Sequence, residues 1–288
     1  MEERMFDDPR DNDTRDRNDD MRERELDWDS RERTDDPRDL FLRDLNLPRE
    51  REREFVLERS HAYRLNGNDS RTLATVGVFR VVSERELSKH QVDHLRGEGL
   101  VQKVWLTPRE RGVVLTRQGR DVLESHSRDR DAPRRQEFHA GIGRARELTH
   151  DAQLHRAYLR AEERLRERGA EVRRVVLEVE LKREYQRFLQ ERNRGNPNSD
   201  GRPTRDRSEI ERWAHDHDLP YADGHVRFPD LRIEYEQRGE EHHEDVEVLT
   251  PHYRGGHASS CGGFSCYGGG SNSGSTPFDP RFAERDRR

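Results

Sequence analysis

SERELSKHQVDHLRGEGLVQKVWLTPRERGVVLTRQGRDVL, the stretch from Ser83 to Leu123, decides the expected fold of the first half of the chain. It opens with two capping boxes, Ser83–Glu86 and Ser88–Gln91. In each, a serine can cap the first turn of a helix while an acid or amide three residues later reaches back. Two helix starts five residues apart predict a very short helix, a tight turn and a second helix. Glycines at positions 97 and 99 are placed to end that second helix.

The chain after this second helix has the pattern of a β-hairpin followed by a helix. Leu100–Leu106 is an extended run, Thr107–Gly112 is rich in turn residues, and Val113–Thr116 returns as a second strand. Arg117–Leu123 resumes helical spacing, and a further helix is expected upstream from Ser70 to Val82. The order helix, helix, helix, hairpin, helix predicts a winged helix-turn-helix domain over residues 60–126. Such a domain presents one helix and one loop to duplex DNA.

Composition divides the rest of the chain into packed and solvated parts. Of its 288 residues, 40% are charged and 29% are hydrophobic, and the mean hydropathy is −1.32, so part of the chain cannot form a core. The net charge of −6 is uneven, because residues 1–54 sum to −8 and residues 70–126 to +3. We therefore expect a disordered acidic arm over 1–54 and a flexible Gly/Ser-rich tail over 258–288. No apolar run reaches the ~18 residues of a membrane span, which favours a cytoplasmic protein.

One segment of the acidic arm is rich in apolar side chains. Between residues 36 and 48 it carries Leu40, Phe41, Leu42 and Leu45. Such a cluster either packs as a short element on the protein's own core or docks onto a partner protein. The sequence leaves both interpretations open.

The second helix and the hairpin tip carry the side chains that could bind DNA. The polar side chains expected to face outward on the helix are Lys89, His90, Gln91, His94 and Arg96, and the hairpin tip adds Arg109 and Arg111. Gln91 can pair with adenine through two hydrogen bonds, and the cations can hold phosphates. A winged helix can also serve as a module that binds protein, but the local charge of +3 favours duplex DNA.

Residues 127–137 read as a charged linker, and residues 138–257 have the pattern of a small α/β domain. A long helix is expected to begin near Thr149, followed by a strand over 171–181 and a helix over 183–192. Ser208 and Glu211 form a third capping box, which predicts another helix. Two strands, 231–236 and 245–249, complete the domain. The predicted fold class is therefore α+β, with a winged helix followed by an α/β domain and a disordered tail at each end.

The last two strands carry a pair of acids that could hold a metal. Alternation along neighbouring strands allows Asp230 and Glu247 to meet. Two carboxylates on adjacent strands are what a Mg²⁺-dependent phosphodiesterase needs, so both are candidate catalytic and Mg²⁺-binding residues. The pair resembles the core of PD-(D/E)xK nucleases, in which a lysine two residues past the second acid assists the attacking water. Here Leu249 occupies that position, with Arg254 or His252 as possible substitutes; an acidic hairpin face without activity is the alternative.

Four residues of zinc-binding type follow. His252, His257, Cys261 and Cys266 have the spacing H-x4-H-x3-C-x4-C, which lacks the close pairs typical of zinc modules. The glycines among them are equally typical of a plain loop, so zinc is not favoured. Two cysteines at this spacing do not indicate a disulfide framework.

Three features together resemble the replication-relaxation type of protein from bacterial plasmids and integrative elements. They are the winged-helix stretch, the run Glu147–Arg156 that opens the long helix, and the Pro229–Asp230 strand with its partner Asp245–Val248. The resemblance covers about residues 60–257 and implies DNA-linked work in maintenance or transfer of the element, with a nuclease-like second domain. Because Leu249 departs from the nuclease pattern, the leading expectation is a non-catalytic DNA-binding protein, accessory to plasmid replication, relaxation or transfer. A Mg²⁺-dependent nuclease and a protein-binding scaffold are the alternatives.

Overall fold

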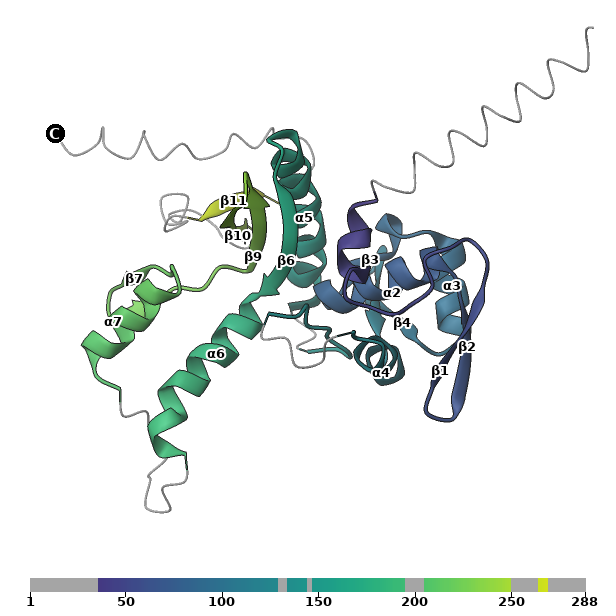
Figure 1. The fold of residues 1–288 in the computed structure, drawn as a ribbon, viewed down its shortest axis with the longest axis horizontal. Helices are drawn as coiled ribbons and strands as arrows, with labels where there is room; N and C mark the ends of the chain where they lie inside the picture. Colours follow the sequence, from purple (N-terminus) through teal and green to yellow (C-terminus); the bar gives the residue numbers. More distant parts are fainter. Residues whose placement is uncertain (1–35, 129–133, 144–146, 195–204, 250–263, 269–288) are drawn as a thin grey trace, which may run out of the picture. The chain divides into compact units, whose positions relative to one another are not determined.

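The computed structural model describes residues 36–128, 134–143, 147–194, 205–249 and 264–268 (Figure 1). The chain divides into two units, Met1–Asp39 and Leu40–Arg288, and the contacts discussed below lie within the second. The protein is a mixed α+β protein with several small sheets. Within the described ranges, no helix is long and apolar enough to cross a membrane.

The acidic arm was expected to be disordered over residues 1–54, but residues 36–54 belong to the described structure and carry part of the core. A 3-10 helix, η1 (Pro37–Leu42), is followed by a hairpin of β1 (Glu54–Glu58) and β2 (His61–Leu65). The side chains proposed to dock a partner are in the core or packed against it: Phe41, Leu42 and Leu45 are buried and Leu40 is partly buried. Removing their apolar surface from water stabilises the fold, which favours the interpretation that this segment packs on the protein's own core.

Helix α2 (Gly67–Phe79) begins three residues earlier than expected. Asn66 caps it, since its side chain accepts a hydrogen bond from the backbone N–H of Asp69 while the Asp69 carboxylate accepts one from the N–H of Asn66. Ser70, the expected first residue, is therefore an interior residue of the helix. Gly67 is required at the first position, because a Cβ there would lie 2.0 Å from the carbonyl oxygen of Arg49.

The two serine caps of the opening stretch do not form, although the helices that they predicted do. Strand β3 (Val82–Ser83) leads into a 3-10 helix, η2 (Glu84–Glu86), and then into α3 (Lys89–Gly97). Neither Ser83 nor Ser88 makes a side-chain capping bond. The hydroxyl of Ser83 donates instead to Glu110 at 2.7 Å. Gly99 adopts a φ of +76° and ends the helical path.

The hairpin after α3 forms as expected. Strands β4 (Val101–Thr107) and β5 (Glu110–Leu115) pair antiparallel, and β3 joins them in the order β3-β5-β4. Helix α4 (Arg117–Ser125) follows, capped by Thr116, whose hydroxyl oxygen accepts from the backbone N–H of Gly119.

The second half of the described chain alternates helices and strands. Helix α5 (Leu148–Glu167) leads to β6 (Glu171–Leu177), α6 (Glu178–Gln190) and a 3-10 turn, η4 (Glu191–Asn193). The strand expected over 171–181 thus ends at residue 177. Helix α7 (Arg207–Asp216) is capped by Asp206 with Glu209, so the predicted cap at Ser208 is two residues too late.

A four-stranded sheet carries the candidate acids. After a short hairpin, β7 (Tyr221–Ala222) and β8 (His225–Val226), come β9 (Leu231–Gln237), β10 (Glu240–Leu249) and β11 (Ser265–Gly268). The sheet order is β11-β10-β9-β6, with β11 parallel to β10, so residues 265–268 are a strand within the tail predicted to be flexible. Helix α5 runs along this sheet and contacts β6, β9 and β10 (Figure 1).

Helix α5 also joins the sheet to the first half of the chain. The ring of Phe79 lies 5.1 Å from that of Tyr158 on α5, and Phe41 lies 5.6 Å from both rings. These aromatic side chains belong to one continuous core that includes residues of α2, α3, α5 and the four-stranded sheet. Burial of so many large apolar groups in one cluster fixes α5 on both halves.

Candidate functional site

The two acids predicted to hold a metal occupy adjacent positions in the sheet, since Asp230 immediately precedes β9 and Glu247 lies on β10. Val246 pairs with Leu231 in the antiparallel β9–β10 ladder, so the next position along places Glu247 beside Asp230. The Asp230 carboxylate is fixed on β10, because its Oδ2 accepts a 2.8 Å hydrogen bond from the backbone N–H of Val248. The register therefore brings the two acids to adjacent positions, as the strand alternation predicted.

A histidine from α5 completes one side of this acid pair. The Nε2 of His150 lies 3.2 Å from Oδ2 of Asp230, and its Nδ1 lies 3.6 Å from a carboxylate oxygen of Asp151. Hydrogen bonds to Asp151 and Asp230 raise the pKa of His150 from 6.5 to about 10, against the effect of burial. His150 is thus an imidazolium at neutral pH. Sequence reasoning used this residue only in the family resemblance.

Glu247 has the opposite electrostatic surroundings. Burial raises its pKa from 4.5 to about 7, and the charges of Asp230 and Glu178 act in the same direction, whereas His150 and Lys182 lower it. Among the described residues its carboxylate receives no hydrogen bond. Glu247 is therefore poised between its neutral and ionised forms near neutral pH, which is a property of functional carboxylates.

Helix α6 contributes two charged groups that sequence reasoning missed at this site. Glu178 opens the helix and donates its backbone N–H to the carbonyl of Asp230 at 3.1 Å. Lys182, one turn later, forms an ion pair with the Glu178 carboxylate. The positive charge of Lys182 thus lowers the pKa of Glu247 from α6. The strand position where the nuclease pattern has its lysine is occupied by Leu249. The i,i+4 acid–lysine pair was visible in the sequence, but its place beside β10 depends on the tertiary fold.

The acid pair fits a small divalent cation by its chemistry. Carboxylate oxygens are preferred ligands of Mg²⁺, which keeps several water molecules and needs only one or two carboxylates from the protein. Within the described ranges, Asp230 and Glu247 do not belong to a close group of three protein ligands. Water or phosphate oxygens would therefore complete the coordination of a cation bound here.

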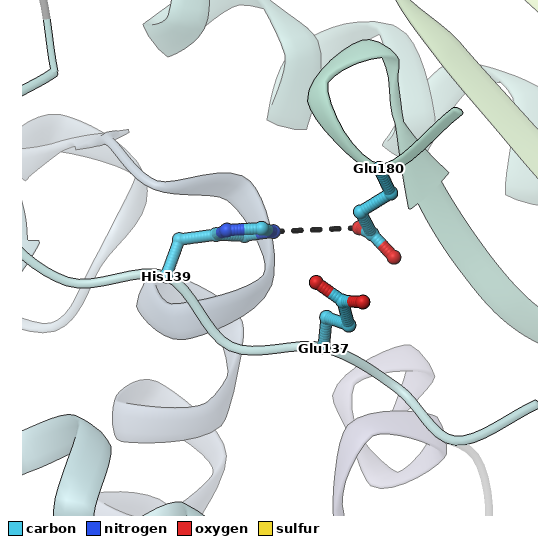
Figure 2. A group of neighbouring side chains, drawn as sticks. All are labelled: Glu137, His139 and Glu180. Carbon is cyan, nitrogen blue, oxygen red and sulfur yellow. Dashed lines mark hydrogen bonds and ion pairs between the residues drawn. The ribbon is translucent and has the colours of Figure 1, made fainter. Parts of the chain in front are cut away.

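Figure 2 shows a second group of side chains of ligand type, Glu137, His139 and Glu180, whose ligand atoms lie within 4.8 Å of one another. His139 Nε2 lies 3.3 Å from Glu180 Oε1. The Glu180 carboxylate also binds Arg174 at 3.1 Å, and Glu137 pairs with Arg183. Both carboxylates are therefore neutralised by arginines, which indicates an ion-pair cluster that stabilises the start of α6.

The predicted DNA-binding residues of α3 divide into exposed and internally bonded side chains. Lys89, His90 and Arg96 are exposed. His94 is not directed outward, because its Nε2 lies 2.7 Å from the carbonyl oxygen of Arg64 on the β2 strand. Gln91 has its side-chain oxygen buried without a hydrogen-bond partner, so the predicted contact of this amide with adenine is not supported by its orientation. A role of these two side chains in DNA binding stays a prediction.

The hairpin tip and the start of α3 surround one open hollow of about 560 Å³. Arg109 and Arg111, predicted from the sequence, are exposed there. Arg85, Lys89 and Trp105 also line it. The sequence analysis did not assign Arg85 or Trp105 to the DNA surface. For Trp105, alternation along β4 did not reveal that the indole is exposed to solvent.

The base of the hairpin is held by α5. Glu110 accepts hydrogen bonds from the hydroxyl of Ser83 at 2.7 Å and from Arg156 at 2.9 Å. The bond from Ser83 and then that from Arg156 lower the pKa of Glu110. His155 and Arg156 bind the carboxylate of Glu86 as well. These charge-assisted bonds fix the hairpin and η2 against the long helix.

The predicted zinc ligands are mostly outside the described residues: His252, His257 and Cys261, together with the possible lysine substitute Arg254. Cys266 lies on β11 and is disulfide-bonded. A cysteine in a disulfide has no thiolate to donate to a metal, so Cys266 is not a zinc ligand in this structure.

Comparisons of the chain with protein-family models, with curated proteins and with solved structures found no match.

Proposed function

We propose that this protein binds duplex DNA through α3 and the β4–β5 hairpin, in an accessory role in the replication, relaxation or transfer of a mobile element. The observation that carries the proposal is the concentration of exposed positive charge at the hollow. Four cations line it, Arg85, Lys89, Arg109 and Arg111, against a single acid, Glu84. A polyanion is the partner that such a surface favours.

The arrangement of the elements supports the same proposal. A helix, a short 3-10 turn, a second helix and a hairpin follow one another in the order typical of a winged helix, in which the second helix enters the major groove. Lys89 and His90, exposed at the start of α3, are placed to reach base edges or phosphates. Arg109 at the hairpin tip is exposed, and among the described residues it forms no ion pair. Its charge is therefore available to a phosphate.

Salt dependence of DNA binding tests this placement. Fluorescence anisotropy of a labelled duplex, measured from low to moderate salt, should give a linear fall of log affinity with log salt. Arg109→Ala should weaken binding of all sequences and reduce that slope by about 1, because one phosphate contact is lost. Arg166→Ala is the matched control, since Arg166 is exposed at the far end of α5. An unchanged slope in Arg109→Ala would remove the hairpin from the interface, and absence of duplex binding even at low salt would favour a protein-binding scaffold.

A second candidate function is a Mg²⁺-dependent cleavage of DNA at the acid pair. The observation that favours it is the raised pKa of Glu247, about 7, beside Asp230 and within the field of Lys182. Asp230 and Glu247 would hold the cation, which would supply Lewis-acid chemistry to a phosphodiester. Lys182 would stabilise negative charge near the reacting phosphate.

Nicking of a supercoiled plasmid in Mg²⁺ tests this second candidate. Asp230→Asn should abolish nicking, because an amide oxygen lacks the charge that holds the cation. Glu240→Gln, at the exposed start of the same β10 strand, should leave nicking unchanged. If wild-type protein leaves the plasmid intact in Mg²⁺ and in Mn²⁺, the acid pair is not catalytic, and the proposed DNA binding stands on its own experiment.

A further inference from the structure

The most unusual side chain at the proposed DNA surface is Trp105. It lies on β4, directly across from Arg111 on β5, and its side chain is 66% exposed. The guanidinium carbon of Arg111 lies 5.6 Å from the ring centroid, a cation–π geometry. Arg111 also pairs with Glu84 at 3.0 Å, so the guanidinium is held from a second direction. The indole is thus a supported but uncovered aromatic surface.

The contrast with the other described tryptophan is informative. Trp213 on α7 is buried to 8% exposure and packs against Tyr185, Phe188 and His217. Burial of such a large apolar ring is favourable, so the exposed indole of Trp105 leaves apolar surface that a ligand can cover. At Trp105 the rim of this surface is cationic. A ligand that fits both features has a flat aromatic group joined to negative charge.

We propose that the Trp105 hollow binds an unpaired nucleobase of DNA, with its flanking phosphates on Lys89 and Arg109. The inference rests on the proposed DNA binding and specifies the DNA: a duplex with a single-stranded extension or fork. A base inside a duplex has both faces covered by its neighbours in the stack, so only an unpaired base can place a face on the indole. The four cations of the hollow favour a negatively charged ligand over an apolar peptide.

The position of the hollow agrees with such a junction. It lies between the start of α3, which in a winged helix contacts the duplex, and the hairpin tip at Pro108 and Arg109. A strand that leaves the duplex beside α3 would pass over the hairpin. Base stacking on an aromatic side chain contributes about 1–3 kcal/mol per base, which corresponds to about 5- to 160-fold in affinity.

Three DNA probes separate stacking from charge. They are a blunt duplex, the same duplex with a single-stranded thymidine extension, and the same duplex with an abasic extension of equal length. The abasic probe has the phosphates of the extension but no base. Full-length wild-type protein should bind the thymidine extension at least 5-fold more tightly than the abasic one in an anisotropy titration.

The variant Trp105→Ala should bring the ratio of these two affinities close to 1, and the affinity of each variant for blunt duplex is the reference for its own ratio. Trp105→Phe should retain part of the ratio, because phenylalanine also stacks. Arg109→Ala is the charge control, and it should weaken binding of all three probes. Thermal unfolding of each variant checks the fold, which an exposed side chain should affect little.

Intrinsic fluorescence gives a second readout. Stacking of a base on Trp105 should quench the indole emission on addition of an oligothymidine, and Trp105→Phe should abolish that quenching. A wild-type ratio near 1, or a ratio that survives Trp105→Ala, overturns the inference while duplex binding remains. Failure of all three probes to bind overturns the proposed function as well.

Discussion

The acid pair makes stability depend on pH in a direction opposite to that of most carboxylates. Glu247 has a pKa of about 7 in the folded protein and an ordinary value of 4.5 when unfolded. The folded state therefore binds more protons than the unfolded state between these two values. Stability conferred by the neutral side chain is complete below pH 4.5, falls as pH rises, and is lost above about pH 7. The variant Glu247→Gln should remove this loss.

The magnitude follows from the two pKa values. Each unit of difference between the folded and unfolded pKa values changes the free energy of unfolding by about 1.36 kcal/mol. A shift from 4.5 to about 7 therefore corresponds to about 3 kcal/mol. Water at the half-buried carboxylate screens part of this, which makes about 2 kcal/mol the more realistic effect. Glu247→Gln should thus be more stable than wild type at pH 8 by about 2 kcal/mol, and close to it at pH 4.5.

Urea denaturation of both proteins across this pH range provides the measurement. His150 also contributes to the wild-type profile, because its pKa rises from 6.5 to about 10 on folding. That contribution is complete below pH 6.5 and is lost as pH rises toward 10. It is present in both proteins, so the difference between them reports the titration of Glu247 together with its coupling to His150. Glu240→Gln, at the exposed end of β10, is the matched control and should show no pH-dependent difference.

Two results would refute the reasoning. One is a difference between Glu247→Gln and wild type that is the same at pH 4.5 and pH 8, since that would mean that the carboxylate titrates alike in both states. The other is a Glu247 pKa below 5 from a carboxyl NMR titration of the folded protein. Either result would place the side chain in water and would remove the main support for a metal site beside Asp230.

The remaining predictions concern the core, a buried ion pair and the acidic arm. Phe41→Ala should lower the free energy of unfolding by about 3–5 kcal/mol in urea, because the ring is buried among other aromatic side chains, and a loss below 1 kcal/mol would contradict that packing. Asp245→Ala should cost about 3–5 kcal/mol in thermal unfolding, since it leaves Arg232 buried without its 2.7 Å and 2.8 Å bonds; near-wild-type stability would argue against the pair. Removal of residues 1–35, which carry a formal charge of −7, should tighten non-specific DNA binding, and equal affinities would show that the arm does not compete with DNA. Removal of residues 1–54 should instead destabilise the protein, because it also deletes Leu42 from the core.

Local sequence patterns predicted most elements of the fold but misplaced their ends. The hairpin after α3 and the strands that carry Asp230 and Glu247 occur as expected, because alternation and turn residues are local signals. At α7, Asp206 takes the capping position that was assigned to Ser208, two residues later. At α2 the helix begins at Gly67, three residues before the expected start at Ser70.

At the candidate sites, too, some contacts follow from local sequence patterns and others depend on the tertiary fold. Strand alternation allowed Asp230 and Glu247 to meet, and the register of β9 with β10 places them at adjacent positions. Lys182, on α6, acts on Glu247 although the two residues are 65 positions apart in the chain. No local sequence pattern predicts a contact between residues so far apart. At the DNA surface, His94 was expected to face outward, but packing of β2 against α3 gives its ring a carbonyl partner.

By itself, the sequence determined the order of the longer helices and strands between residues 67 and 249, the uneven charge, and a pair of acids that could meet. These features depend on residues near one another in the chain, whose spacing sets periodicity and turns. Only the tertiary structure decided which polar groups are exposed and which are satisfied internally. It brought Lys182 and His150 to the acid pair, placed Phe41 in the core and left Trp105 in solvent. The physical reason is that burial and charge pairing depend on contacts between distant segments, which the chain acquires only when it packs.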